Sequence, residues 1–310
     1  MAAALQWPVA EGVQWARAPG GLSGAAVWRS DAFALKMWPT SMPWERLARI
    51  HSWMDQAGHL AFVPKVMRTR AGSTIAEEDG RIWDLTTWMP GEVHTPLADA
   101  SGFPNCVRPL NACSSLAELH RGWHLPTPRF EPCPGVLRRM QVLADWKKGR
   151  GALAGAAGLV HRASEAVDGL VEAAERALTP WQARTVPLHP CLCDVHREHV
   201  LYTGNEVTGI IDYGAMKIDN AAVDLARMLG DFVGDDDAQL AAGVEAYRAA
   251  NTAFRLPTEF VRLLDRTGVL GGAIVWMLRF IEDSALFDRS PAALQRFANL
   301  VERIDNFRGI

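Results

Sequence analysis

Short runs of apolar residues, separated by Gly, Asp and Pro, fill the chain up to residue 89. These runs occupy residues 13–16, 25–28, 33–38, 62–67 and 82–88. Runs of this length and punctuation are typical of strands in an antiparallel sheet. Residues 43–56 differ, because Trp44, Leu47, Ile50 and Trp53 follow a Pro in a helix-opening position and lie near one helical face. The pattern therefore predicts strands, one helix and then further strands.

The pattern changes after Pro90-Gly91, which is a turn signal and a natural domain boundary. Helix-forming stretches follow at residues 110–120, 135–146 and 152–178, with a second helical group from residue 220 to the C-terminus. We therefore expect a small lobe over residues 1–89 and a larger helical lobe over residues 90–310. Residues 187–220 form a non-helical island between the two helical groups. Loops on a helical scaffold can expose a side chain and still hold it, so we place the candidate chemistry in this island.

Composition excludes several classes of protein. With 49% hydrophobic and 22% charged residues, the chain is expected to be globular. Its formal net charge of −3 gives no field that would recruit nucleic acid or an anionic membrane. The chain has 5 cysteines, an odd and sparse number that indicates a reducing compartment, and no signal peptide is apparent. The longest apolar run, 269–278, is too short to span a bilayer, so we expect a buried helix and a cytoplasmic protein with no membrane partner.

The non-helical island predicts a hairpin that gathers polar groups. The β-prone runs 200–202 and 207–211 are joined through Gly204-Asn205, which suits a two-residue type II′ turn. Pairing outward from this turn sets residue 199 opposite residue 210, unless a longer loop shifts it by about one position. Asp194, His199 and Asp212 are then expected to converge. Two carboxylates there could accept a hydroxyl proton and hold a metal, although loop aspartates more often cap turns.

The island also resembles a known family. The run from Asp194 to Leu201, followed by the run from Val207 to Gly214, is similar to the catalytic loop, hairpin and metal-binding segment of the aminoglycoside phosphotransferase-like kinases. By this resemblance Asp194 matches the catalytic base, Asp212 the metal-binding aspartate, and Asp224 the buried aspartate that braces the catalytic loop.

Two departures from the family pattern stand in the same segment. The family usually has His-Gly-Asp where this chain has Leu192-Cys193-Asp194, and an Asn where it has His199. The Asn oxygen would ligate the metal, whereas an imidazole suits softer ions than Mg²⁺. The resemblance implies Mg²⁺ as the metal, and the imidazole of His199 makes Mn²⁺ the alternative. His199 is expected to assist the metal or the base, or else to be a structural hydrogen-bonding residue.

The same resemblance implies a nucleotide site in the first lobe. The Gly20–Gly24 turn, with Gly21, Ser23 and Gly24, would cover phosphates, and Lys36 in its apolar strand would hold them, unless it points outward to solvent. Glu45 on the following helix is expected to pair with Lys36, with Asp55 as its competitor. Trp88 and Met89 match the inter-lobe hinge whose backbone would bond a purine.

The sequence therefore predicts an α+β, protein-kinase-like two-lobed fold with a small antiparallel-sheet lobe and a larger helical lobe. The predicted activity moves the γ-phosphoryl of ATP or GTP to a hydroxyl of a small-molecule acceptor, with no nucleic acid involved and the oligomeric state left open. One alternative is a catalytically weak or inactive nucleotide-binding regulatory relative. A further alternative is a zinc-dependent hydrolase built on the His and Cys residues of the island, although their spacing is unusual for zinc.

Two acidic clusters leave the nature of the acceptor open. Asp235–Asp237 and Glu282-Asp283 could bind a cationic sugar, although a solvated loop and a helix end explain them better.

Overall fold

The chain divides into two compact units. A computed structural model describes residues 3–18, 24–95, 107–153, 155–307 and 309–310. Unit 1 takes residues 1–124 and 197–216, and unit 2 takes residues 125–196 and 217–310. Both units are thus built from segments far apart in the sequence. The sequence predicts a boundary after residue 89 between a nucleotide-binding lobe and an acceptor-binding lobe. This functional division stays a prediction.

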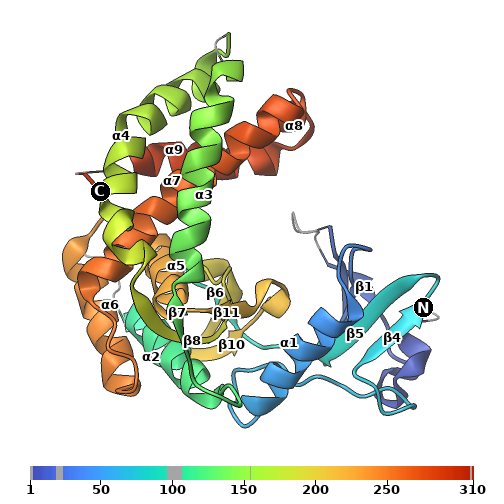
Figure 1. Ribbon diagram of the computed structural model, residues 1–310. Coiled ribbons are helices and arrows are strands. Elements are labelled where there is room, and N and C mark those ends of the chain that lie inside the picture. Colours follow the sequence, from blue (N-terminus) through green and yellow to red (C-terminus); the bar gives the residue numbers. More distant parts are fainter. Residues whose placement is uncertain (1–2, 19–23, 96–106, 154, 308) are drawn as a thin grey trace. The chain divides into compact units, whose positions relative to one another are not determined.

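The main sheet of unit 1 confirms the strands predicted at residues 25–28, 33–38 and 82–88. The run 13–16 overlaps a strand only at Ala16, and residues 75–78 form a strand that no apolar run predicts. The strands of this sheet stand in the order β1-β2-β3-β5-β4 and pair antiparallel (Figure 1). Their bounds are β1 Ala16–Arg17, β2 Ala26–Arg29, β3 Phe33–Met37, β4 Ile75–Glu78 and β5 Arg81–Thr87. Two short 3₁₀ turns, η1 Ala3–Gln6 and η2 Pro8–Ala10, precede the sheet. Trp7, Leu35, Trp83 and Leu85 are buried together in one core cluster.

One predicted strand is wrong. Residues 62–67 form no strand, although Val66 makes an isolated bridge with Thr86. Pro64 lacks an N–H group and interrupts any ladder there. Phe62 uses its carbonyl oxygen to accept a hydrogen bond from Ile210 N–H at 2.8 Å, so this segment supports the hairpin.

The predicted helix is present as α1, Trp44–Gln56, and packs on the sheet through Leu47. Leu47 lies in a cluster with Trp38 and Ile75, so α1 covers the sheet face that carries Lys36 and Trp38. Unit 1 also contains α2, Val107–Gly122.

The predicted hairpin is present, with one shift of register. β9, Val200–Thr203, pairs with β10, Glu206–Ile210, and β6, Glu92–Val93, adds a third strand. Gly204 has φ +61°, as the first central residue of a type II′ turn requires. Residues 203 and 206 pair as predicted, but a bulge at Thr208 sets Ile210 opposite Val200 instead of His199. Thr208 Oγ1 donates to Pro90 O at 2.8 Å, a contact that the turn sequence alone does not encode.

Unit 2 is mainly helical, as predicted for the later part of the chain. Figure 1 shows α3, α4, α7 and α9 side by side, and these helices contact one another. The helices are α3 Pro134–Gly149, α4 Gly158–Gln182, α5 Ala222–Val233, α6 Asp237–Ala250, α7 Thr258–Glu282, α8 Leu286–Arg289 and α9 Pro291–Asp305, with a 3₁₀ turn η3 at Arg150–Leu153. A three-stranded antiparallel sheet has the order β11-β8-β7, with bounds Lys217–Asp219, Thr185–Cys191 and Arg129–Pro132. The mixed α+β class is therefore confirmed.

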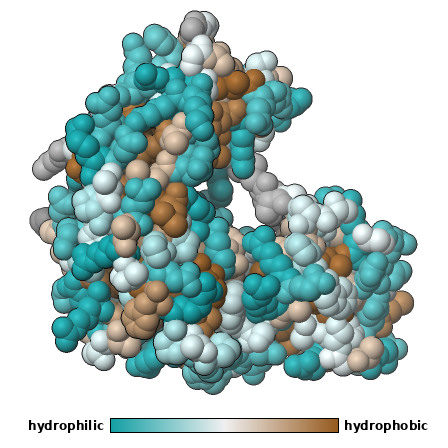
Figure 2. Space-filling model, in the orientation of Figure 1, coloured by the Kyte–Doolittle hydropathy of each residue, from teal (hydrophilic) through white to brown (hydrophobic). Residues whose placement is uncertain are grey.

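Hydrophilic residues cover most of the face seen in Figure 2, with smaller hydrophobic areas between them. No helix among the described residues is long and apolar enough to cross a membrane. The run 269–278 lies within α7, where Val269, Leu270, Ala273, Ile274 and Met277 are buried, as expected.

Candidate active site

Asp212 sits in a backbone conformation that is rare for residues other than glycine. It follows β10 with φ +61° and precedes the 3₁₀ turn η5, Tyr213–Ala215. Its side chain accepts a hydrogen bond from Gly214 N–H at 3.4 Å, and Ile211 N–H donates to His199 O at 2.9 Å. The hairpin therefore holds the Asp212 segment beside His199, which lies in the 3₁₀ turn η4, Arg197–His199.

Three of the predicted site residues come together in unit 1. Lys36 Nζ lies 3.0 Å from Asp212 Oδ1, and His199 Nε2 lies 3.9 Å from Asp212 Oδ2. The Lys36 ammonium also lies 4.0 Å from the centroid of the Trp38 ring, which fixes its direction by a cation–π contact. Lys36 thus points toward Asp212 instead of outward into solvent.

The charge environment keeps Asp212 ionised. Burial would raise the pKa of the Asp212 carboxyl, but the charge and hydrogen bond of Lys36 outweigh it, and His199 acts in the same direction, so the pKa is lowered. An ionised carboxylate is the form that ligates a divalent cation. The residues at hand, one carboxylate and one imidazole, fit Mg²⁺ only in part and fit Mn²⁺ better.

Two further residues hold the segment after Asp212. Arg46 of α1 donates from Nη2 to Gly214 O at 3.0 Å. A Cβ on Gly214 would lie 2.9 Å from Cζ3 of Trp38, so only glycine lets this tryptophan pack against the turn. Trp38 therefore contacts both the turn and Lys36, which the sequence did not reveal.

The structure does not bring Lys36 and Glu45 together. Glu45 lies exposed in the first turn of α1, and Asp55 pairs with Arg68 at 3.4 Å. Among the described residues the ion pair of Lys36 is with Asp212, and the roles of Glu45 and Asp55 stay predictions.

A buried acid lies opposite Lys36 instead. Asp84 of β5 is the cross-strand partner of Lys36, so the two side chains leave the same face of the sheet. Asp84 Oδ2 lies 2.9 Å from Nε2 of His51 on α1, and His51 Nδ1 lies 2.9 Å from Thr74 Oγ1. Asp84 is a lone acid inside an apolar run, just as Lys36 is a lone lysine in an apolar strand. The criterion that singled out Lys36 would therefore also have singled out Asp84.

The other predicted nucleotide-site residues are placed only in part. Gly21 and Ser23 lie outside the described residues, while Gly24 is described and has φ +73°. Trp88 is partly exposed, and its backbone N–H donates to Ala32 O at 2.8 Å, whereas Met89 is buried. Their contacts with a nucleotide stay predictions.

The loop that carries Asp194 belongs to unit 2 and is held by Asp224 of α5. Both carboxylate oxygens of Asp224 accept backbone hydrogen bonds, from Leu192 N–H and Cys193 N–H, each at 2.6 Å. The prediction that Asp224 braces this loop is therefore confirmed. Cys193 has φ +64°, the left-handed conformation that a glycine would adopt without strain.

Arg227 is the residue at this loop that the sequence did not reveal. It lies one turn after Asp224 on α5, and its Nη2 is 2.9 Å from Asp194 Oδ1. An exposed arginine on a helix has the same sequence signal as any solvated charge, so only the tertiary structure identifies it.

The cysteines of unit 2 behave as buried packing groups. Burial raises the pKa of the Cys133 thiol to about 11 and also raises the pKa of Cys191 and Cys193. Cys133 and Cys191 are buried, and their thiols hydrogen-bond to Asp219 Oδ1 and to His189 O, each at 3.5 Å. The zinc-dependent hydrolase stays an alternative.

Comparison with known proteins gives one family and many similar folds. The model of the phosphotransferase enzyme family matches residues 14–257. A choline/ethanolamine kinase family protein from Mesorhizobium loti is 18% identical with a TM-score of 0.61, covering 99% of this chain and 94% of that chain.

Two further solved structures have a similar fold. Spectinomycin phosphotransferase, in complex with ADP and spectinomycin, is 13% identical with a TM-score of 0.64, covering 95% of this chain and 93% of that chain. Amicoumacin kinase, in complex with AMP-PNP and Ca²⁺, is 12% identical with a TM-score of 0.64, covering 99% of this chain and 92% of that chain. No curated protein sequence matches the chain. The matches confirm the predicted family resemblance and the protein-kinase-like fold.

Proposed function

The chain belongs to the phosphotransferase enzyme family, and from this premise we propose that it transfers the γ-phosphoryl group of ATP or GTP to a hydroxyl of a small molecule. The observation that carries the proposal is the cluster that Lys36 of β3 forms with Asp212 and His199, the residues at the base of the hairpin. It pairs a lysine that can hold phosphates with a carboxylate that can hold a metal.

The proposed reaction assigns one role to each candidate residue. Asp194 accepts the hydroxyl proton, the acceptor oxygen forms a bond to the γ-phosphorus, and the bond from that phosphorus to the β–γ bridging oxygen breaks, releasing the nucleoside diphosphate. Lys36 binds phosphate oxygens, and Asp212 with His199 would hold Mg²⁺ or Mn²⁺. When bound, the metal neutralises charge that develops on the phosphate oxygens. We also propose residues 1–89 as the nucleotide-binding lobe, residues 90–310 as the acceptor-binding lobe, and the cytoplasm as the location.

Nucleotide binding tests this proposal directly. ATP and GTP, each with Mg²⁺ or Mn²⁺, are titrated by calorimetry into the wild type, Asp212→Asn and the control Glu206→Gln, an exposed acid on the same hairpin. We expect metal-dependent binding that Asp212→Asn abolishes and Glu206→Gln preserves. Equal binding by all three proteins, with or without metal, would refute the role of Asp212.

One observation favours a second candidate, the regulatory relative. Both carboxylates proposed for catalysis are paired with cations, Asp212 with Lys36 and Asp194 with Arg227. Nucleotide binding without phosphoryl transfer to any acceptor would favour this reading.

A further inference from the structure

Three exposed or half-exposed cations of unit 2 surround the loop that carries Asp194. Arg227 comes from α5, Lys217 from β11 and Arg138 from α3. Lys217 pairs in register with Cys191, the last residue of β8 before the loop. Arg138 pairs with the fully buried Asp219, the last residue of β11.

Charged side chains around the loop shift the pKa of a thiol inside it, that of Cys193. Burial raises the pKa of the Cys193 thiol, the charges of Asp224 and Asp219 raise it further, and Lys217 and Arg138 act to lower it. Arg227 contacts Asp194 itself, and both side chains of that pair are more than 40% exposed, at 43% and 45%. The guanidinium is therefore within reach of a ligand that approaches Asp194.

Two acids near the loop lie below its surface, and one of them, Asp219, balances the charge of Arg138 directly. Asp219 and Asp224 are both fully buried, and their oxygens accept hydrogen bonds from the backbone. The three cations that these contacts place at the loop stand beside Asp194, while the exposed Glu198 follows the loop in the sequence and Asp231 follows Arg227 by one helical turn on α5.

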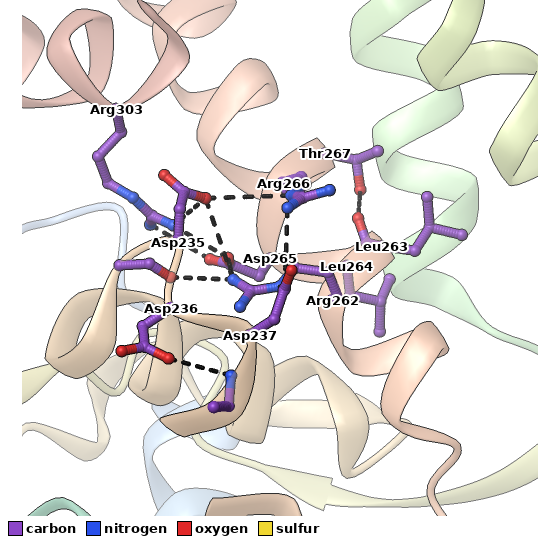
Figure 3. A network of polar contacts seen from close by, with 12 residues as sticks. Asp235, Asp236, Asp237, Arg262, Leu263, Leu264, Asp265, Arg266, Thr267 and Arg303 are labelled. Atoms are coloured by element: carbon purple, nitrogen blue, oxygen red, sulfur yellow. Dashed lines mark hydrogen bonds and ion pairs between the residues drawn. The ribbon is translucent and has the colours of Figure 1, made fainter. Parts of the chain in front are cut away.

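Three acids of the two clusters that could bind a cationic sugar also form ion pairs. Asp235 and Asp237 lie in a network with Arg262, Arg266 and Arg303 (Figure 3). Asp283 pairs with Arg289. Arginines therefore compete with a cationic acceptor for Asp235, Asp237 and Asp283.

We propose that the acceptor carries an anionic group, a carboxylate or a phosphate, in addition to the hydroxyl that is phosphorylated, and that Arg227 binds this group. Lys217 and Arg138 add attraction for the same charge. The proposal rests on the proposed phosphotransfer and specifies its acceptor. A cationic acceptor would instead meet like charge next to Asp194.

Such an acceptor also explains how Asp194 becomes available. In the free protein the guanidinium of Arg227 occupies the Oδ1 side of the Asp194 carboxylate. An anionic group competes for the guanidinium and leaves Oδ1 open to the acceptor hydroxyl. The hydroxyl proton then passes to Asp194 as the new P–O bond forms, so Arg227 couples acceptor recognition to the proposed base.

Acceptors that share one carbon skeleton test the proposal. Gluconate, glucose 6-phosphate, glucose and glucosamine are offered with nucleotide and metal to the wild type, Arg227→Gln and the control Arg176→Gln, an exposed arginine of α4. We expect turnover with an anionic member, the choice between gluconate and glucose 6-phosphate telling carboxylate from phosphate. Because a charged hydrogen bond contributes about 1.5–3 kcal/mol, Arg227→Gln should raise the KM for that acceptor roughly 10- to 150-fold. The KM for nucleotide should not change, and the control should match the wild type.

The outcomes separate this proposal from the phosphotransfer itself. A preference for glucose or glucosamine, or an Arg227→Gln effect on the nucleotide KM alone, would overturn the anionic acceptor while leaving the kinase intact. If no member of the series is phosphorylated, calorimetric titration of gluconate and glucose 6-phosphate into the free and the nucleotide-bound protein decides. Binding that Arg227→Gln removes supports the anion site even where nucleotide fails to bind, and absence of binding counts against it.

Discussion

Unit 2 contains a buried group of arginine–aspartate contacts around Asp265 and a half-exposed arginine–aspartate pair, Arg227 with Asp194. Around Asp265, Arg303 donates from both terminal nitrogens, at 3.2 and 2.9 Å, and Arg262 adds a third contact at 3.2 Å (Figure 3). The side chains of Asp265 and Arg262 are only 3% and 10% exposed. The pair of Arg227 and Asp194 has a single 2.9 Å contact and stands open to solvent.

The difference indicates which arginines hold the fold and which can serve a ligand. A buried ion pair cannot be separated without leaving a charge in a poorly solvated site, so the Asp265 network ties α7 to α9. A half-exposed pair exchanges its partner for water or a ligand at little cost. We therefore assign the Asp265 network to stability and the Arg227–Asp194 pair to function.

Breaking the buried network should give the largest effect. Replacing Asp265 by Ala leaves Arg262 and Arg303 without this shared partner, and we expect a loss of about 3–5 kcal/mol in the free energy of unfolding. Urea denaturation of the wild type, Asp265→Ala and the control Asp288→Ala, an exposed acid of α8, measures it. If Asp265→Ala does not fold, Asp265→Asn keeps the shape and should still unfold at lower urea than the wild type. A change below about 1 kcal/mol in Asp265→Ala would place this network with the exposed pairs.

The buried pair in unit 1 extends the comparison. His51 and Asp84 are both buried, so His51→Leu leaves the Asp84 carboxyl without a bond that it makes in the wild type. We expect a loss of about 1–3 kcal/mol, measured by the same denaturation. Asp84→Leu combined with His51→Leu should recover part of it, because both polar groups are then removed. No recovery in the double variant would mean that packing, and not the polar contact, explains the loss.

A substitution in the loop before Asp194 should raise the free energy of unfolding instead of lowering it. Cys193 has φ +64°, a conformation that costs a residue with a Cβ about 1–2 kcal/mol. Cys193→Gly removes this strain but adds freedom to the unfolded chain, so we expect a net gain of about 0.5–1 kcal/mol. Cys193→Ala keeps the strain and serves as the matched control. Equal stability of the Gly and Ala variants would show that the loop is not strained here.

Sequence reasoning succeeded where a residue's role follows from its neighbours in the chain. Gly204-Asn205 between two β-prone runs predicts the hairpin, and Lys36 is conspicuous as a lone lysine in an apolar strand. Asp224, at the start of a helix, was assigned to the loop through the family resemblance, and the structure shows both of its hydrogen bonds.

The features that were missed depend on contacts between distant segments. The bulge at Thr208 accompanies its bond to Pro90, and the strand predicted over residues 62–67 is replaced by a segment that supports Ile210. Asp84 stands out as an acid in an apolar run, but its partner His51 is 33 residues away and meets it only where α1 packs on the sheet. Arg227 has the least local signal, because nothing in α5 distinguishes it from an ordinary surface arginine.

Substitution of Arg227 should have the smallest effect on stability. That small effect would distinguish the Arg227–Asp194 pair from the Asp265 network. Arg227→Gln removes one exposed ion pair, so the free energy of unfolding should change by no more than about 0.5 kcal/mol. The loop should stay in place, because Asp224 holds its backbone without help from Arg227. Urea denaturation gives the stability, and hydrogen exchange at the amides of Leu192 and Cys193 reports on the loop. A loss of several kcal/mol, or fast exchange at those two amides, would mean that Arg227 holds the loop as Arg303 holds α9. Unchanged stability and exchange would leave its charge free to act on a ligand.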